Sequence, residues 1–460
     1  MLFSSLNQKK SFFETNYFII TLVVGWLLFS PILFFLCAVF SSSSEISTSD
    51  LAQELTTVAD FSATTATTSE PADQNCTKKR IVGYYTGWET MEVTAEQLRK
   101  LTHVIFLHAV VTTKSTLEFE STHSMERFLD MQKEAKKAKE VNEDLKVMVS
   151  IGGWRNSKLI SGLLKDPMKL QELIKTILSF VKKYQLDGVE IFWIDPVLDK
   201  KLKDETKEKF SNFIRDLKSN LFHAHSESTS SSGFILSMAV PSFVESIREV
   251  YNFKELVKSV EFINVQSYDY FDPGAGKLPL IGPTSPMFAG NGGNVEDTMK
   301  YLICTTKHPE KLNMGVAFHG TYWKNVSLPY LRREFVFTTV KFLNRSSIIH
   351  LQTQPHEVSY GDLKIELRTW KDAKFHFHNE SKSSYYWMPK TKTFLTIETE
   401  KSLREKMVYA NRKKLGGTVM MSIDQDDEHH SLLDVVVENN GCISTANDEL
   451  KYNCNLWKIL

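Results

Sequence analysis

Eight short segments rich in apolar and β-branched residues recur along the chain after residue 80. They are IVGYY (81–85), HVIFL (103–107), KVMVSI (146–151), GVEIFWI (188–194), FILSMAV (234–240), EFINVQ (261–266), LNMGVAF (312–318) and GTVMMSI (417–423). Runs of this length and composition are typical of buried β-strands. Because both faces of these runs are largely apolar, they predict a parallel sheet that is covered on both sides.

Helical patterns lie between most of these segments. Thr94 and Gln97 form a capping box before one helix, and Asp166 with Pro167 opens another whose apolar residues recur at helical spacing. Alternating strands and helices predict an α/β fold, and eight strands favour a closed (β/α)8 TIM barrel over an open doubly wound sheet. The alternation fails longest over residues 319–393, which we interpret as an inserted subdomain after the seventh strand.

Residues 17–40 form an uncharged run that is long enough to span a bilayer, for which about 20 residues suffice. Lys9 and Lys10 precede this run, and the next basic residue after it is Lys78. The charge distribution predicts a transmembrane signal-anchor, with residues 1–16 in the cytosol and the remainder lumenal or extracellular, as in a single-pass type II membrane protein. The alternative is a cleaved signal peptide, whose apolar region usually has about 7 to 15 residues.

Residues 41–75 are rich in Ser and Thr and show no apolar periodicity. Such a segment cannot bury enough apolar surface to fold, so we predict a stalk that leads into a barrel domain over residues 76–460. Four glycosylation sequons are compatible with an outward-facing domain. They start at Asn75, Asn325, Asn344 and Asn379.

The cysteines fit an oxidising compartment. Cys37 lies within the predicted span, whereas Cys76, Cys304, Cys442 and Cys454 can form disulfides in three ways, of which Cys442 with Cys454 is the most local. No Cys-x-x-Cys or Cys/His spacing is present, so we expect no metal site. Lys plus Arg equals Asp plus Glu, at 55 each, so no charge excess favours a nucleic-acid partner.

Catalytic groups of a TIM barrel lie at the carboxyl ends of its strands. Here the third strand ends in SIGGW (150–154), the sixth in QSYDY (266–270) and the eighth in MMSIDQDD (420–427). Taken singly, these are ordinary features: a glycine turn, a buried tyrosine and an exposed acidic loop. Together they form a more specific pattern.

The combination resembles glycoside hydrolase family 18, which contains chitinases and chitinase-like proteins. The resemblance runs from about Arg80 to about Asn439 and rests on GYYTGW, SIGGW, LDGVEIFWIDP, NVQSYD, KLNMGVAFHG and LGGTVMMSIDQDD, all in family order. It implies a small α+β insertion subdomain after strand seven, recognition of chitin-like oligosaccharides, and no cofactor.

Active members of that family carry the pattern D-G-x-D-x-D-W-E on strand four. Its Glu protonates the leaving glycosidic oxygen, while the substrate's own N-acetyl oxygen attacks the anomeric carbon. In this sequence Glu190 replaces the second Asp, Phe192 the third Asp, and Ile194 the Glu. Neither Phe192 nor Ile194 can transfer a proton, so the resemblance implies a protein without the catalytic acid.

Asp195 is the nearest alternative acid on this strand. Successive side chains of a strand point to opposite faces, so the three replaced positions would share the inward face and Asp195 would point away from it. We therefore expect no carboxylate placed for catalysis. Glu190 is expected to be an interior acid hydrogen-bonded to Tyr268 or Asp269, and Asp187 a structural cap near the strand entrance.

A ligand cleft is also implied by the resemblance. Its predicted residues are Tyr84, Trp88, Trp154, Tyr268, Asp269 and Met421. In relatives, the Tyr and Asp of strand six hold the N-acetyl group, and a Trp on strand eight forms the floor under the sugar; Met421 takes the place of that Trp. Trp88 and Trp154 could stack on sugar rings or simply pack loops at the rim.

These features predict a membrane-anchored, chitinase-like protein that lacks the catalytic glutamate and serves in binding or signalling. Its partner would be a chitin or N-acetylglucosamine oligosaccharide, bound weakly, or an extracellular protein. Two alternatives stay open. One is a residual glycosidase that uses an unaligned carboxylate, and the other is a structural ectodomain without affinity for glycans.

Overall fold

The computed structural model describes residues 76–194, 203–226, 233–271, 280–288, 293–324, 326, 338–339, 356–368, 370–444, 452 and 454. All of them belong to one unit of the chain, residues 73–460. The predicted cytosolic segment, membrane span and stalk lie outside the described residues, as do Asn75, Asp195, Asn325 and Asn344. Within the described ranges, no helix is long and apolar enough to cross a membrane.

All eight predicted barrel strands are present. They are β2 (Arg80–Thr86), β3 (His103–Val111), β5 (Lys146–Gly152), β6 (Gly188–Phe192), β7 (Ile235–Val240), β8 (Phe262–Val265), β10 (Leu312–Ala317) and β17 (Gly417–Met421). They pair in parallel in the order β2-β17-β10-β8-β7-β6-β5-β3, and β3 pairs back with β2. This pairing closes the predicted barrel, to which β4 (Leu117–Phe119) adds an antiparallel edge on β3.

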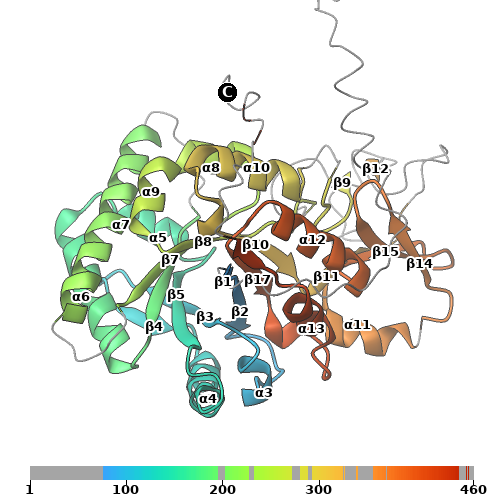
Figure 1. Cartoon of the computed structure of the whole chain (residues 1–460), viewed down its shortest axis with the longest axis horizontal. Helices are drawn as coiled ribbons and strands as arrows, with labels where there is room; N and C mark the ends of the chain where they lie inside the picture. Colours follow the sequence, from blue (N-terminus) through green and yellow to red (C-terminus); the bar gives the residue numbers. More distant parts are fainter. Residues whose placement is uncertain are drawn as a thin grey trace, which may run out of the picture. The chain divides into compact units, whose positions relative to one another are not determined.

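Helices cover the outside of the barrel (Figure 1). They are α3 (Ala95–Leu98), α4 (Thr122–Lys139), α5 (Ser157–Leu163), α6 (Pro167–Lys183), α7 (Lys203–Ser226), α8 (Val244–Val250), α9 (Phe253–Ser259), α10 (Val295–Thr306), α12 (Glu400–Arg412) and α13 (Ser431–Glu438). Two predicted helix starts are confirmed: Thr94 accepts a hydrogen bond from the Gln97 backbone amide, and Asp166 caps α6, which begins at Pro167. The predicted capping box is not completed, because the Gln97 side chain donates to the Ile423 carbonyl at 2.7 Å instead. The main core lies between strands and helices, and a smaller apolar cluster fills the barrel interior.

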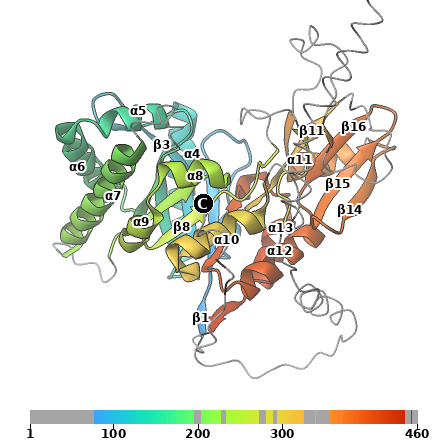
Figure 2. The same cartoon turned by 90° about the horizontal axis from the view of Figure 1, so that it is seen from above.

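The predicted insertion subdomain follows β10 and forms a sheet of its own (Figure 2). Its elements are β11 (His319–Trp323), β13 (His356–Ser359), α11 (Tyr360–Leu367), β14 (Lys374–His378), β15 (Ser383–Met388) and β16 (Thr393–Ile397), with the antiparallel strand order β13-β11-β16-β15-β14. The predicted end at residue 393 is wrong, because β16 begins there and pairs with both β11 and β15. The short strands β9 (Leu280–Ile281) and β12 (Thr338–Thr339) also pair.

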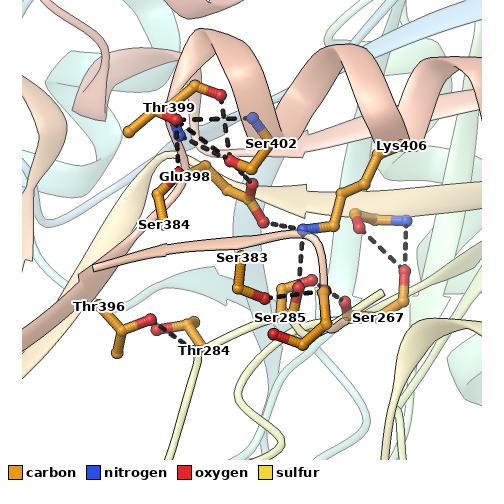
Figure 3. Close-up of polar contacts among 12 residues, drawn as sticks. Ser267, Thr284, Ser285, Ser383, Ser384, Thr396, Glu398, Thr399, Ser402 and Lys406 are labelled. Carbon is orange, nitrogen blue, oxygen red and sulfur yellow. Dashed lines mark hydrogen bonds and ion pairs between the residues drawn. The ribbon is translucent and has the colours of Figure 1, made fainter. Parts of the chain in front are cut away.

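A buried ion pair joins the insertion to the barrel (Figure 3). Lys406 of α12 contacts the Glu398 carboxylate and donates to the Ser285 carbonyl at 2.7 Å, while the Ser402 hydroxyl donates to Glu398 at 2.6 Å. Burial lowers the pKa of Lys406, although the Glu398 charge opposes this. Because a buried charge is costly without its partner, these contacts fix α12 against the end of β16.

The disulfide pairing differs from the most local one. Cys304 at the end of α10 is bonded to Cys454, across a sequence separation of 150 residues. Cys442 is disulfide-bonded as well, and it lies on β18 (Cys442–Ser444), which pairs with β1 (Cys76–Lys78). Of the three pairings that the sequence left open, the structure therefore excludes the most local one, Cys442 with Cys454, because the fold brings Cys454 to α10.

Candidate functional site

Strand β6 divides its side chains between two environments. Ile191 and Trp193 belong to the large core between the barrel and its helices. Phe192 and Ile194 form a separate apolar cluster with Ala239 of the neighbouring strand β7. Phe192 is 4% exposed and Ile194 8%. The two positions that the family pattern assigns to the acid and its neighbour therefore hold buried hydrocarbon side chains.

Glu190 lies deeper in the barrel, with no exposed surface. Its carboxylate accepts hydrogen bonds from Asn264 at 2.6 Å, Ser150 at 2.9 Å and Tyr84 at 3.0 Å. Burial raises the pKa of Glu190 to about 7, although these three hydrogen bonds lower it. Tyr84 is itself buried, so its hydroxyl serves this interior contact rather than an exposed surface.

A chain of side-chain hydrogen bonds leads to Glu190 from the amino end of the barrel. The Arg80 guanidinium donates to the Asn313 carbonyl oxygen at 2.9 Å, and the Asn313 amide donates to Asn264 at 2.8 Å. Asn264 in turn donates to Glu190. Every donor in this chain points toward the carboxylate, so the chain favours the charged form of Glu190 and partly offsets the effect of burial on its pKa.

Tyr268 and Asp269 follow β8, at the carboxyl end of the barrel. Neither side chain is hydrogen-bonded to Glu190, so the expected hydrogen bond from Tyr268 or Asp269 is wrong. The Glu190 carboxylate accepts instead from side chains of β2, β5 and β8. Burial and the charges of Asp269 and Glu190 raise the pKa of Tyr268 well above its ordinary value, which keeps its hydroxyl protonated. That hydroxyl lies beside Gln266 and has no partner of good geometry among the described residues.

His319, at the start of β11, is a site residue that the sequence reasoning missed. Its Nε2 lies 3.0 Å from the Asp269 carboxylate. Burial alone would lower the pKa of His319, but the charges of Asp269 and Glu357 raise it to about 9. At neutral pH an imidazolium therefore pairs with Asp269. The sequence feature that could have identified His319 is its position directly after the apolar seventh strand, at the end of the barrel where active sites are found.

Trp88 and Trp154 are both solvent-accessible, at 47% and 65% exposure. The Trp88 ring centroid lies 5.9 Å from that of His108 on β3. Gly153, with a φ of 86°, approaches the His108 ring so closely that a Cβ there would lie 2.5 Å from it. Gly153 of SIGGW therefore allows the backbone to approach His108 closely, just before the exposed Trp154.

Met421 ends β17 and packs against the apolar cluster inside the barrel. It is partly buried, and its carbonyl accepts a hydrogen bond from the Phe318 amide at 2.6 Å. A flexible thioether at this position supplies apolar surface, but it lacks the flat face that an indole would offer to a sugar ring.

The acidic loop after β17 is buried, which contradicts the simple interpretation of it as exposed. Asp424 accepts from Arg127 at 2.7 Å and from the Thr86 hydroxyl at the same distance. Asp426 accepts from the amides of Leu432 and Leu433 at the start of α13. These carboxylates therefore fix the loop to β2, α4 and α13.

A pair of carboxylates that the sequence did not reveal lies next to this loop. The Gln425 side-chain amide donates to Glu89 and to Glu357, each at 3.1 Å. Burial, with the charges of Asp424 and Glu357, raises the pKa of Glu89, while the Gln425 hydrogen bond lowers it. One amide thus links a barrel loop to strand β13 of the insertion.

Two other site predictions concern metals and glycosylation. In the part of the chain that the structure describes, no group of three or more His, Cys, Asp or Glu side chains could hold a metal ion. Asn379 is the one sequon residue within the described ranges, and it is exposed in the turn after β14.

Asp187 accepts from the Val147 amide at 2.7 Å and from Lys139 at 2.9 Å, as expected of a cap before β6.

Comparison with known families agrees with this geometry. The profile described as "Glycosyl hydrolases family 18" matches residues 80–426, which include all eight barrel strands and the insertion. The chain belongs to glycosyl hydrolase family 18. Among curated proteins, it is 25% identical to probable chitinase 2 of Drosophila melanogaster over 293 residues, which cover 62% of this chain and 56% of that protein.

Other relatives give a similar picture. The probable endochitinase of Caenorhabditis elegans is 23% identical over 315 residues, 65% of this chain and 46% of that protein. The chain thus spans about half the length of these two relatives. Among solved structures, Ostrinia furnacalis Group IV chitinase has a TM-score of 0.65 at 22% identity, covering 78% of this chain and 99% of that one. Human YKL-39, described as a pseudo-chitinase with retained chitooligosaccharide binding, has a TM-score of 0.66 at 20% identity with the same coverage.

Proposed function

We propose that this chain is a catalytically inactive member of family 18 that binds N-acetylglucosamine oligomers weakly. The observation that carries the proposal is the apolar cluster of Phe192, Ile194 and Ala239. Family catalysis needs a proton donor at the position of Ile194, and a hydrocarbon side chain has no proton to transfer.

Retained binding is supported by the groups at the carboxyl end of the barrel. Trp88 and Trp154 are accessible for stacking, and Tyr268 and Asp269 are the residues that hold the N-acetyl group in relatives. The human pseudo-chitinase YKL-39 gives a precedent for binding without catalysis. Because Met421 replaces the sugar floor, we expect affinity for chitin oligomers no tighter than high micromolar, about −5 to −6 kcal/mol.

Membrane anchoring is the second part of the proposal. Residues 17–40 would serve as an uncleaved anchor, residues 41–75 as a stalk, and the barrel would be lumenal or extracellular. The chain enters the barrel through Cys76–Lys78, just before β2, so it enters at the end opposite the candidate site. Carbonate washing followed by N-terminal analysis tests this: the protein should stay in the membrane fraction with its first 16 residues, and a soluble product starting near Ser41 would overturn it.

A residual glycosidase is the competing function, and one observation favours it. Burial and nearby charges raise the pKa of Glu89, which shares the Gln425 amide with Glu357, so a pair of carboxyl groups lies outside β6. A protein-binding or purely structural ectodomain would need neither this pair nor the exposed tryptophans.

Release of a fluorophore from a chitobioside distinguishes these functions. We expect no turnover by the wild type or by Ile194→Glu, since a lone carboxyl beside Phe192 would be buried without its partner. The triple variant Phe192→Asp, Ile194→Glu, Met421→Trp restores the catalytic acid, its neighbouring Asp and the Trp under the sugar together. It should show measurable turnover, because such groups act as a unit. Wild-type activity that disappears in Glu89→Gln would overturn the proposal in favour of the glycosidase.

A further inference from the structure

Two adjoining depressions lie among the outer helices, away from the carboxyl end of the barrel. The larger, about 860 Å³, is lined by α7 to α10 and reaches the disulfide of Cys304 with Cys454. The smaller, about 620 Å³, lies between α7 and α9. Both are lined by Lys207 and Lys258, but the smaller one also carries the carboxylates of Asp204, Glu208 and Glu255. We therefore use the name outer groove for the larger depression alone. Figures 1 and 2 show these helices side by side on the barrel wall.

The larger depression is strongly basic. Its charged lining consists of one carboxylate, Glu249, and five cationic side chains; these are Lys207, Arg248, Lys254, Lys258 and Lys307. His308 also lines it but faces the Glu310 carboxylate at 2.8 Å. Since the whole chain carries equal numbers of acidic and basic residues, this is a local concentration of positive charge rather than a general property.

Local ion pairs do not use up this charge. Lys258 pairs with Glu255 and Lys207 with Asp204, each three residues apart on one helix and partly exposed to solvent. Arg248 lies 3.8 Å from the Glu249 carboxylate, and both of these side chains are also partly exposed. Such exposed pairs are weak and exchange readily for a better anion. Lys254 is exposed and makes no ion pair among the described residues.

Favourable interaction with a helix dipole accounts for the positions of only some of these cations. Arg248 and Lys258 stand in the last turns of α8 and α9, and Lys307 caps α10, where positive charge favours the helix dipole. Lys254, however, stands in the first turn of α9, where a cation opposes the dipole. The dipole also gives no reason for the cations of four different helices to line one depression.

We propose that the outer groove binds a linear, sulfated glycan of the glycosaminoglycan class. A concave groove with cations along its length fits a polyanionic chain better than it fits a planar membrane surface. Lysine ammonium groups are compact point charges that suit sulfate and carboxylate groups. Sulfated glycans, rather than nucleic acids, follow from the lumenal or extracellular placement proposed above, whereas the groove itself is independent of chitin binding.

The test uses the full chain in detergent and a heparin-derived octasaccharide, with calorimetry at several salt concentrations. We expect binding that weakens steeply as salt increases, and no binding of the desulfated octasaccharide. Charge reversal at three groove positions (Lys254→Glu, Lys258→Glu and Lys307→Glu) should lower the affinity at least about tenfold. The affinity for chitotetraose should not change, which separates this inference from the proposed function.

A matched control reverses three exposed lysines on α4 and α6, helices that do not line the groove, through Lys133→Glu, Lys136→Glu and Lys182→Glu. It should retain most of the affinity for the octasaccharide. If charge reversal in the groove disrupts folding, alanine at the same three groove positions gives the comparison. Equal losses in the groove and control variants, or wild-type binding to phosphatidylserine vesicles or a DNA oligonucleotide but not to the octasaccharide, would overturn the proposal.

Discussion

Glu190 should make the stability of this barrel depend on pH. Its carboxyl group is fully buried, and burial raises the pKa from the ordinary 4.5 to about 7. Between these pH values the folded chain holds the proton more tightly than the unfolded chain, so the free energy of unfolding falls as the pH rises. A pKa difference of about 2.5 corresponds to about 3 kcal/mol of stability, present below pH 4.5 and lost by pH 7.

The substitution Glu190→Gln removes this titration while keeping the side-chain volume, an acceptor oxygen for Asn264 and Tyr84, and an NH2 group that can donate to the Ser150 hydroxyl. Near pH 5 the variant and the wild type should differ little in the free energy of unfolding. Near pH 8 the variant should be more stable by about 3 kcal/mol, because the wild type then buries a charge. Urea unfolding followed by tryptophan fluorescence, from pH 5 to pH 8, measures both proteins.

Other groups also titrate in this range. Burial raises the pKa of Asp426 to about 6, and the charges of Asp269 and Glu357 outweigh burial to raise that of His319 to about 9. Both groups are present in the wild type and in the variant, so the difference between the two proteins isolates Glu190. A difference that stays constant from pH 5 to pH 8, or a variant less stable than the wild type at pH 8, would refute the reasoning.

Three other substitutions test the disulfide, the buried ion pair and the proposed ligand surface. Cys304→Ser opens the disulfide to Cys454 and should lower the free energy of unfolding by about 5 kcal/mol in urea titrations, because the bond closes a loop of 150 residues. Lys406→Met should cost about 3 to 5 kcal/mol, since it leaves Glu398 buried and unpaired, and adding Glu398→Met should recover most of the loss. Trp88→Ala should weaken chitotetraose binding about tenfold by calorimetry with an unchanged melting temperature, because the ring is half exposed; an unchanged affinity would identify Trp88 as a packing residue.

The barrel could be predicted because its signals are local. Each barrel strand is a short apolar run, and each helix start that we predicted depends on residues within three positions of one another, as with Thr94 and Gln97. The closed barrel then follows from the number of strands, eight, and from their alternation with helices. Where a boundary depends on pairing, local signals fail: β16 belongs to the insertion only because it pairs with β11 and β15.

Buried charge was the other source of error. A run such as DQDD is typical of an exposed loop, since acids are seldom fully buried without partners. Here the partners come from distant segments. Arg127 of α4 binds Asp424 across 297 positions, and the amides of α13 bind Asp426. Composition alone cannot distinguish a solvated acid from one whose hydrogen bonds are supplied by the fold.

The same argument explains why the partners of Glu190 were predicted wrongly and what its presence means. Its donors Tyr84, Ser150 and Asn264 lie 106, 40 and 74 positions away, on three strands whose register fixes their height in the barrel. An apolar residue in place of Glu190 would leave those three buried donors without an acceptor, at about 1 to 3 kcal/mol each. The barrel therefore needs an acceptor at this position whether or not it hydrolyses a glycan. The carboxylate of Glu190 is thus explained by the packing of the barrel, and catalytic competence has to be judged at Phe192 and Ile194 instead.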